Sequence, residues 1–363
     1  MVKDQLISYI EDNNIFSKFQ SGYRARHSCE TALNFVLAKW KEISSNGDVI
    51  LAVFLDLKRA FETIDRERLL RKLKVLGFSP SALSWFKGYL SNRGQRTKVN
   101  GQMSANIPNE LGVPQGSVLG AILFILYIND MPSHLTNVFV NLFADDTLIY
   151  LHGKNIDVLS DRMNCELEKI NQWLRLNKLK LNVSKTKVMV LGHPSKATAV
   201  NRISIDGVDL EIVNHIKYLG VMIDFKLDFK ENVDYVCKKV AKKVGVLSRL
   251  AGTITMGARI SIYKAIIAPH FDYCSSLLFL SDQSAFDRLQ KLQNRAMITF
   301  NGDIHRYPTR TRGDFYVKVT RSERENNSLF KRGLILFNSL TKELKEEKSE
   351  AVFKNKLRQF VKT

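Results

Sequence analysis

The apolar and polar positions in the first two thirds of the chain alternate between strand and helix patterns. The run VILAVFLDL at 49–57 is too short and too rich in β-branched residues for a helix of its own, and it suits a buried strand that ends on Asp56. VFVNLF and TLIYLHG, which flank two adjacent aspartates, predict the two strands of a hairpin. Apolar residues at helical spacing over 159–174 predict a long amphipathic helix.

Residues that favour helix ends mark where further helices begin. Ser28 precedes a helical apolar pattern over 33–40, and Asp65 precedes a leucine-bearing helix that Gly77 should end. Pro80 has the favoured first-turn position of another helix. The apolar block VLGAILFILYI at 118–128 is too short to span a bilayer and predicts a buried helix.

The pattern changes in the last third of the chain. Short strand-like runs (KVMVLG, ISIDG, VDLEIV and KYLGVMID) precede it, and from about residue 228 helical periodicity takes over. One apolar stripe of valines and a leucine runs along 233–247, with most of the nearby lysines off it. We therefore expect an α+β fold around an antiparallel sheet, followed by a mainly helical, basic region.

The net charge of the chain indicates what kind of partner it binds. The 363 residues include 55 Lys plus Arg against 36 Asp plus Glu, a formal net charge of +19. Such an excess favours a polyanionic partner, because each neutralised phosphate releases counterions, although a basic surface can also serve solubility alone. Four scattered cysteines and the lack of an apolar leader or spanning run predict an intracellular protein, nuclear or cytoplasmic, with no membrane partner.

The aspartates supply the candidate chemistry. Asp56 ends one predicted strand, and Asp145 and Asp146 occupy the tip of the predicted hairpin, so neighbouring strands would bring three carboxylates to one edge. Without cations the cluster would repel itself and resist desolvation. Mg²⁺ prefers such oxygen ligands, and two ions about 3.5–4 Å apart can activate a hydroxyl and stabilise a leaving phosphate. A solvated turn is the alternative, weakened by the flanking LFA and TLIY.

Five blocks in order carry a family resemblance. FLDLKRAFETID, GVPQGSVLGAILF, FADD, LNVSKTKVMVLG and KYLGVMID resemble the palm motifs of reverse transcriptases, most closely those of non-LTR retrotransposons of the jockey and LINE-like group. The resemblance begins near SGYRARHSCETAL and extends more loosely through RLQKLQNRAM. It implies a right-hand polymerase, with partial fingers over 1–48, the palm over 49–224 and a basic thumb-like and C-terminal region over 225–363.

The resemblance also implies the metal site and the proton donor. Asp56 and Asp145 would be the principal ligands of two Mg²⁺ ions, with Mn²⁺ as a substitute, and Asp146 would be the second carboxylate of the hairpin pair. Lys185 would give a proton to the departing pyrophosphate, a role that lysine chemistry permits. A solvated loop lysine would leave the same sequence pattern.

Four more residues match the family's substrate-binding positions. Phe61 would lie beneath the incoming sugar and exclude a 2′-hydroxyl, although a core aromatic in the strand-to-helix turn would look alike. Gln115 and Gly116 would line the nucleotide and template pocket, and the same PQG is also typical of a turn before a helix capped by Ser117. Arg24 would grip the triphosphate, with Arg26 as the alternative.

The implied function is that of an RNA-directed DNA polymerase. An RNA template, a DNA primer and deoxynucleoside triphosphates would be its partners, and the sequence leaves any protein partners unknown. Family members carry more fingers sequence before the SGYR block, so we expect an N-terminally truncated chain. An inactive remnant that only binds RNA or DNA is the main alternative. A nucleotide cyclase would share the carboxylates, but it would not account for GVPQGS or the basic helical region.

Overall fold

The computed structural model describes residues 1–114, 116–192, 202–250 and 252–298. Two units make up the chain: the first is Met1–Lys238 with Leu277–Arg288, and the second is Lys239–Ser276 with Leu289–Thr363. Gln115 lies outside the described residues, as does the predicted thumb-like region beyond residue 298. All other residues of the predicted site belong to the first unit.

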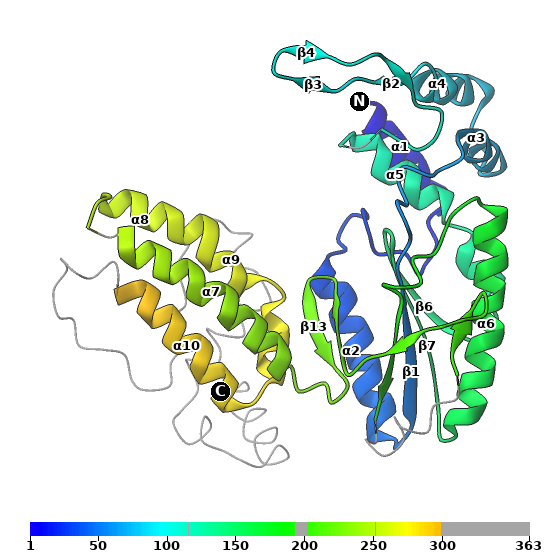
Figure 1. Ribbon diagram of the computed structural model, residues 1–363. Coiled ribbons are helices and arrows are strands. Elements are labelled where there is room, and N and C mark those ends of the chain that lie inside the picture. The colour runs from blue at the N-terminus through cyan, green and yellow to red at the C-terminus, as the bar shows by residue number, and fades with distance from the viewer. Residues whose placement is uncertain (115, 193–201, 251, 299–363) are drawn as a thin grey trace, which may run out of the picture. The chain divides into compact units, whose positions relative to one another are not determined.

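A five-stranded sheet is the centre of the first unit (Figure 1). Its strands, in spatial order, are β11 (Glu211–Ile212), β8 (Lys187–Leu191), β1 (Val49–Leu55), β7 (Asp146–Gly153) and β6 (Phe139–Phe143). All neighbours are antiparallel except β11 and β8, which are parallel. Every residue of β1 is buried, because helices cover both faces of the sheet. The predicted buried strand is confirmed as Val49–Leu55, which ends one residue before Asp56, and the predicted hairpin is confirmed as β6 and β7.

The helices of the first unit pack on this sheet or above its end (Figure 1). They are α1 (Val2–Asp12), α2 (Cys29–Ser45), α3 (Arg66–Val75), α4 (Pro80–Leu90), α5 (Val118–Tyr127), the 3₁₀ turn η1 (Met131–His134) and α6 (Ile156–Leu176). Trp40 of α2 contacts Phe54 and Tyr150 edge-on, on the sheet face that these two side chains share. The alternate residues of β1 belong to the core that α5 and α6 complete. The alternation along β1 thus fixes which helix covers which face.

The predicted helix ends agree with the structure. The side-chain oxygens of Ser28, Asp65, Ser79 and Ser117 each accept a hydrogen bond from a backbone N–H in the first turn of α2, α3, α4 and α5. After α3, Gly77 has a φ of +85°, the left-handed conformation that glycine adopts without a Cβ penalty. These ends depend on local chemistry, which is why the sequence predicts them.

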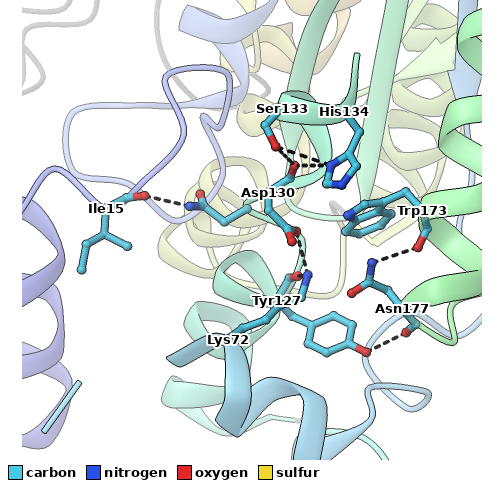
Figure 2. Close-up of polar contacts among 9 residues, drawn as sticks. Ile15, Lys72, Tyr127, Asp130, Ser133, His134, Trp173 and Asn177 are labelled. Atoms are coloured by element: carbon cyan, nitrogen blue, oxygen red, sulfur yellow. Dashed lines mark hydrogen bonds and ion pairs between the residues drawn. The ribbon is translucent and has the colours of Figure 1, made fainter. Parts of the chain in front are cut away.

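A half-buried lysine joins three helices of the first unit (Figure 2). Lys72 of α3 donates to the carbonyl oxygen of Tyr127 and to Oδ1 of Asp130, both at 2.7 Å. Its ammonium also lies 5.0 Å from the ring centroids of Tyr127 and Trp173. The Tyr127 hydroxyl donates to the carbonyl of Asn177 at 2.6 Å, just beyond α6. These contacts hold α3, α5 and α6 together.

The remaining strands are short, and the later elements are helical. Two-residue strands β2 (Gly94–Gln95), β3 (Lys98–Val99), β4 (Gln102–Met103) and β5 (Ile107–Pro108) form one long hairpin; β9 (Ser204–Ile205) pairs with β10 (Val208–Asp209), and β12 (His215–Tyr218) with β13 (Val221–Asp224). The helices that follow are α7 (Lys230–Leu250), α8 (Met256–Ile262), η3 (Tyr263–Ile267), α9 (Ala268–Asp272), η4 (Ser275–Leu280) and α10 (Gln283–Ile298). The predicted change to helices is confirmed as far as residue 298. Among the described residues, no helix is long and apolar enough to cross a membrane.

Asp65 gives a prediction for the stability of the fold. Burial alone would raise the pKa of Asp65, but hydrogen bonds from Lys178 and from the N–H of Arg68 outweigh it and hold the pKa below its ordinary value. A lowered pKa in the folded state stabilises the fold above the unfolded pKa, and this gain is lost as pH falls through the folded value. We expect Asp65→Ala to cost about 1–2 kcal/mol of unfolding free energy at neutral pH.

Denaturation in urea at two pH values measures this effect. The difference between wild type and Asp65→Ala should shrink once the pH falls below about 4, where the carboxyl of the unfolded chain takes up its proton. Asp65→Asn is the matched control, because asparagine keeps the cap and loses only the charge that pairs with Lys178. A difference that does not change with pH would contradict the role of the charge.

Candidate active site

The three predicted carboxylates meet at one end of the central sheet. Leu55 of β1 pairs with Thr147 of β7, so the next step of the antiparallel register sets Asp56 opposite Asp146. Asp145 lies in the turn between β6 and β7, and Asp146 is the first residue of β7 rather than a turn residue. The preceding residue, Ala144, has a φ of +55°, a conformation that residues with a Cβ rarely adopt. The turn that presents Asp145 is therefore held in place by its surroundings.

Burial and mutual repulsion make the ionised form of these carboxylates unfavourable. Burial, followed by the charge of Asp56, raises the pKa of Asp145. Burial and the charges of Asp145 and Asp56 raise the pKa of Asp146 to about 6, although Asp146 as a whole residue stays exposed. Among the described residues, none of the three forms an ion pair. A cluster of oxygen ligands without a protein cation suits a bound divalent cation.

The side chains are neighbours but do not form a ready-made metal cluster. In the part of the chain that the structure describes, no three His, Cys, Asp or Glu side chains are gathered closely enough to hold an ion. Asp56, Asp145 and Asp146 fit Mg²⁺ by their chemistry and by their place on adjacent strand ends. Binding an ion would require their carboxylates to draw together, which a divalent charge would favour.

Gln20 supports the turn, and sequence reasoning missed it. Its side chain is 1% exposed, and its Oε1 accepts hydrogen bonds from the N–H groups of Gly22 (2.7 Å) and Ala144 (3.1 Å). Around it the backbone runs parallel to β6, with the N–H of Leu142 donating to Phe19 at 2.9 Å. The segment that begins the SGYR block thus binds directly to the turn that carries Asp145. A glutamine between SKF and SG gives no local signal of this role.

Asp56 is positioned by the loop that carries Lys185. The carbonyl of Asp56 accepts from the N–H of Asn182 at 2.7 Å, and its N–H donates to Oγ1 of Thr186 at 3.3 Å. Lys185 is exposed within this turn, whose N–H groups at 185 and 186 donate back to the carbonyl of Asn182. The structure therefore brings the loop of Lys185 next to Asp56.

A cavity of about 810 Å³ adjoins Phe61, and we call it the Phe61 pocket. Its walls come from α1, the SGYR block and the segment that begins α5, and they consist of Lys3, Ile7, Tyr23, Arg24, Ala25, Phe61, Pro114, Gly116, Ser117, Val118, Gly120, Ala121 and Ile122. The predicted residues Arg24, Phe61 and Gly116 thus line one cavity, whereas the aspartates do not line it. The Phe61 ring packs 4.5 Å from that of Phe124, centroid to centroid, so it is also part of the core.

Part of the Arg24 guanidinium is hydrogen-bonded to the loop that carries it. One guanidinium nitrogen, Nη1, donates to the carbonyls of Ser17 (3.3 Å) and Gln20 (3.1 Å), and the group lies 5.6 Å from the Phe16 ring centroid. This tether fixes the arginine at the pocket wall. Arg26, the alternative, is exposed, with a φ of +62°, and it is not among the lining residues.

Arg66 is a second residue that sequence reasoning missed. Its guanidinium donates three hydrogen bonds to backbone carbonyls, at Asn109 (2.5 Å), Leu111 (2.8 Å) and Gly112 (2.7 Å). Gly112, with a φ of +76°, donates in turn to the carbonyl of Ile64, and the next residue donates to Phe61 at 3.0 Å. A Cβ at Gly112 would lie 2.7 Å from the carbonyl oxygen of Glu62, so only glycine permits this approach. Arg66 therefore fastens the loop before Pro114 to the Phe61 turn.

Comparison with known proteins identifies the class. Residues 1–223 match the reverse transcriptase (RNA-dependent DNA polymerase) family model, so the chain belongs to the reverse transcriptase family. Its relatives include the RNA-directed DNA polymerase from mobile element jockey of Drosophila melanogaster, 28% identical over 318 residues. The probable RNA-directed DNA polymerase from transposon X-element of the same species is 26% identical over 310 residues. The predicted resemblance to non-LTR retrotransposon reverse transcriptases is confirmed.

The matches cover much of this chain but a smaller part of its relatives. Both alignments span 83% of the chain and 34% of each relative, so the chain corresponds to about a third of their length. Among solved structures, apo telomerase from Candida tropicalis aligns with 82% of this chain and 53% of its own, at 11% identity and a TM-score of 0.44.

Proposed function

We propose that this chain is the RNA-directed DNA polymerase core of a non-LTR retrotransposon and adds deoxynucleotides to a primer 3′-hydroxyl. The observation that carries the proposal is the meeting of Asp56, Asp145 and Asp146 at adjacent strand ends, with raised pKa values at Asp145 and Asp146 and without a protein cation. The predicted fingers, palm and thumb divisions belong to this proposal. So do the RNA template, the DNA primer and the deoxynucleoside triphosphates.

In this proposal, the carboxylates at the strand ends bind the metal ions, and the Phe61 pocket binds the nucleotide. Asp56, Asp145 and Asp146 would hold two Mg²⁺ ions, which supply charge stabilisation and activate the primer hydroxyl. Arg24 would bind the triphosphate from the wall of the Phe61 pocket, and Phe61 would pack against the sugar, where a 2′-hydroxyl would clash. Lys185, exposed in the turn bound to Asp56, would give a proton to pyrophosphate. Positioning and charge stabilisation would provide most of the rate acceleration.

Primer extension on an RNA template tests the proposal. The purified full-length chain is incubated with Mg²⁺, a DNA primer and all four deoxynucleotides, beside a reaction with the four ribonucleotides. We expect extension with deoxynucleotides and little with ribonucleotides. Tight, salt-sensitive binding without extension would favour an inactive RNA- or DNA-binding remnant. Pyrophosphate release without a primer would favour a cyclase-like reaction.

Arg66 gives a further prediction about the pocket loop. Arg66→Ala removes three charged hydrogen bonds, so the segment before Pro114 should loosen against Phe61. Because this loop leads to the pocket and not to the carboxylates, we expect the KM for deoxynucleotides to rise about tenfold, with a smaller change in kcat. Single-nucleotide addition at varied nucleotide concentration separates the two constants.

Arg66→Lys is the matched variant for this measurement. Lysine keeps the charge but cannot match the three-carbonyl geometry, so it should recover only part of the loss. If both variants have the wild-type KM while losing stability, Arg66 only supports the fold.

A further inference from the structure

Helix α4 carries a stacked row of side chains, which we call the aromatic ladder (Trp85, Tyr89 and Arg93). The rings of Trp85 and Tyr89 are parallel, with 5.5 Å between centroids and 6° between planes. Beyond the end of the helix, the guanidinium of Arg93 lies 5.0 Å from the Tyr89 ring centroid and donates twice to the Tyr89 carbonyl, at 2.9 and 2.8 Å. Trp85 is 44% exposed, which is unusual for so large an apolar surface.

The aromatic ladder is attached to the Phe61 pocket. The Tyr89 hydroxyl donates to Oγ of Ser117 at 2.9 Å, and Ser117 caps α5 and lines the pocket. Any strand that follows the ladder would therefore reach the pocket beside Ser117.

The hairpin after α4 continues this surface with positive charge. Every residue from 91 to 111 is exposed, and within that range Glu110 is the single acidic residue. The turn at Asn100 and Gly101, with φ values of +49° and +85°, sets the register in which Lys98 pairs with Met103. Arg96 lies just before β3, so two exposed cations lie close together in this arm of the hairpin. Neither Arg96 nor Lys98 forms an ion pair among the described residues.

We propose that the aromatic ladder, together with Arg96 and Lys98 of this hairpin, binds single-stranded RNA, the unpaired template on its way to the Phe61 pocket. Bases stack on aromatic rings and on arginine planes whatever their sequence, while unpaired cations bind the phosphates between them. An acidic peptide would match the cations but not the parallel ring faces. The inference rests on the proposed function, because that function supplies the template.

The three tryptophans of the chain make the test specific. Trp40 and Trp173 are 0% and 2% exposed, so Trp85 is the one tryptophan of the three on which a ligand in solution can stack. We expect single-stranded oligouridylate to quench the emission of the exposed tryptophan in the full-length chain. A duplex RNA of the same length should quench it much less. Equal quenching by the duplex would overturn stacking on unpaired bases.

Substitutions locate the surface. Trp85→Ala should abolish the quenching and weaken binding of labelled single-stranded RNA, followed by fluorescence anisotropy, by about 5- to 100-fold. Trp85→Phe keeps a ring, so it should retain most of the affinity while losing the signal. The pair Arg96→Ala and Lys98→Ala should lower the slope of log affinity against log salt by about 1.4, or 0.7 for each phosphate contact.

A control that removes the same amount of charge lies on α3 and α4, away from the proposed surface. Lys74 of α3 and Lys87 of α4 line a separate groove. Lys87 is two residues from Trp85 and two from Tyr89, a spacing that puts it on the opposite side of the helix from the aromatic ladder. Lys74→Ala with Lys87→Ala removes the same charge and should leave the quenching unchanged and alter the salt slope less. An equal loss of affinity in this control would overturn the proposed surface.

The experiments distinguish an incorrect RNA surface from an incorrect polymerase assignment. Asp145→Asn should keep the quenching, since Asp145 is not part of this surface. Quenching without any primer extension would leave the RNA surface standing and remove the polymerase assignment. Primer extension by the wild type, together with an RNA affinity that Trp85→Ala leaves unchanged, would remove the RNA surface and leave the polymerase assignment standing.

Discussion

Asp145→Asn should abolish primer extension without unfolding the chain. Asparagine keeps the shape of the side chain but not the charge that a divalent cation needs, so we expect the rate of nucleotide addition to fall by at least about 10²–10³-fold. Burial and Asp56 already raise the pKa of Asp145, which means that its charge opposes folding when no ion is bound. The variant should therefore be at least as stable as the wild type in the absence of divalent cation.

A control of the same chemistry lies at the opposite end of the same strands. Asp48 immediately precedes β1, and its carboxylate pairs with Nδ1 of His152 on β7 at 2.8 Å. Asp48→Asn should keep extension and lose some stability, which reverses the pattern expected of Asp145→Asn. Single-turnover extension and urea denaturation measure the two quantities. Extension by Asp145→Asn at the wild-type rate would rule out Asp145 as a metal ligand of the reaction.

Local signals account for what the sequence predicts well. β1 is a continuous apolar run rich in β-branched residues, and the caps at Ser28, Asp65 and Ser117 act on the N–H groups of their own helices. The hairpin around the aspartates follows from two apolar runs separated by a short turn. Such features depend on residues a few positions apart, so the pattern of one segment is enough to predict them. The roles assigned to Asp56, Asp145, Asp146, Arg24, Phe61, Gly116 and Lys185 stay predictions until the experiments above are done.

The supports of the site depend on which distant backbones lie together, and no local pattern records this. Gln20 acts on a turn more than a hundred positions later, and Arg66 acts on carbonyls beyond a long hairpin. Both side chains satisfy backbone groups, and the sequence alone does not distinguish them from any other polar residue at those positions. The sequence therefore predicts the carboxylates better than the contacts that place them.

The site contains an unfavourable arrangement of charge, which contacts from a distant segment offset. The turn at Ala144 has a positive φ, and the carboxylates that follow repel one another, so neither feature favours this conformation by itself. The buried segment from Phe19 to Gly22 supplies the compensating hydrogen bonds. We infer that the SGYR block is needed for the geometry of the aspartates as well as for the Phe61 pocket.

Gly22→Ala is the sharpest test of that support. A Cβ at Gly22 would lie 2.4 Å from the backbone nitrogen of Ala144 and 3.0 Å from Oε1 of Gln20, so the segment and the turn must move apart. Overpacking of this kind should lower the unfolding free energy by about 1–3 kcal/mol. The displaced turn carries Asp145, and a shift of that size should slow nucleotide addition by about 10²-fold. Single-turnover extension under conditions where the variant remains folded measures the catalytic part.

Gly88→Ala is the matched control for the added methyl group. Gly88 lies within α4, and a Cβ there would have nothing within 4 Å. Alanine favours a helix over glycine by up to about 1 kcal/mol, so this variant should be slightly more stable and extend the primer at the wild-type rate. If Gly22→Ala matched Gly88→Ala in both measurements, the contact between the SGYR block and the turn would have no part in holding Asp145. A loss of rate confined to Gly22→Ala would show that the aspartates work only in the geometry that this distant segment imposes.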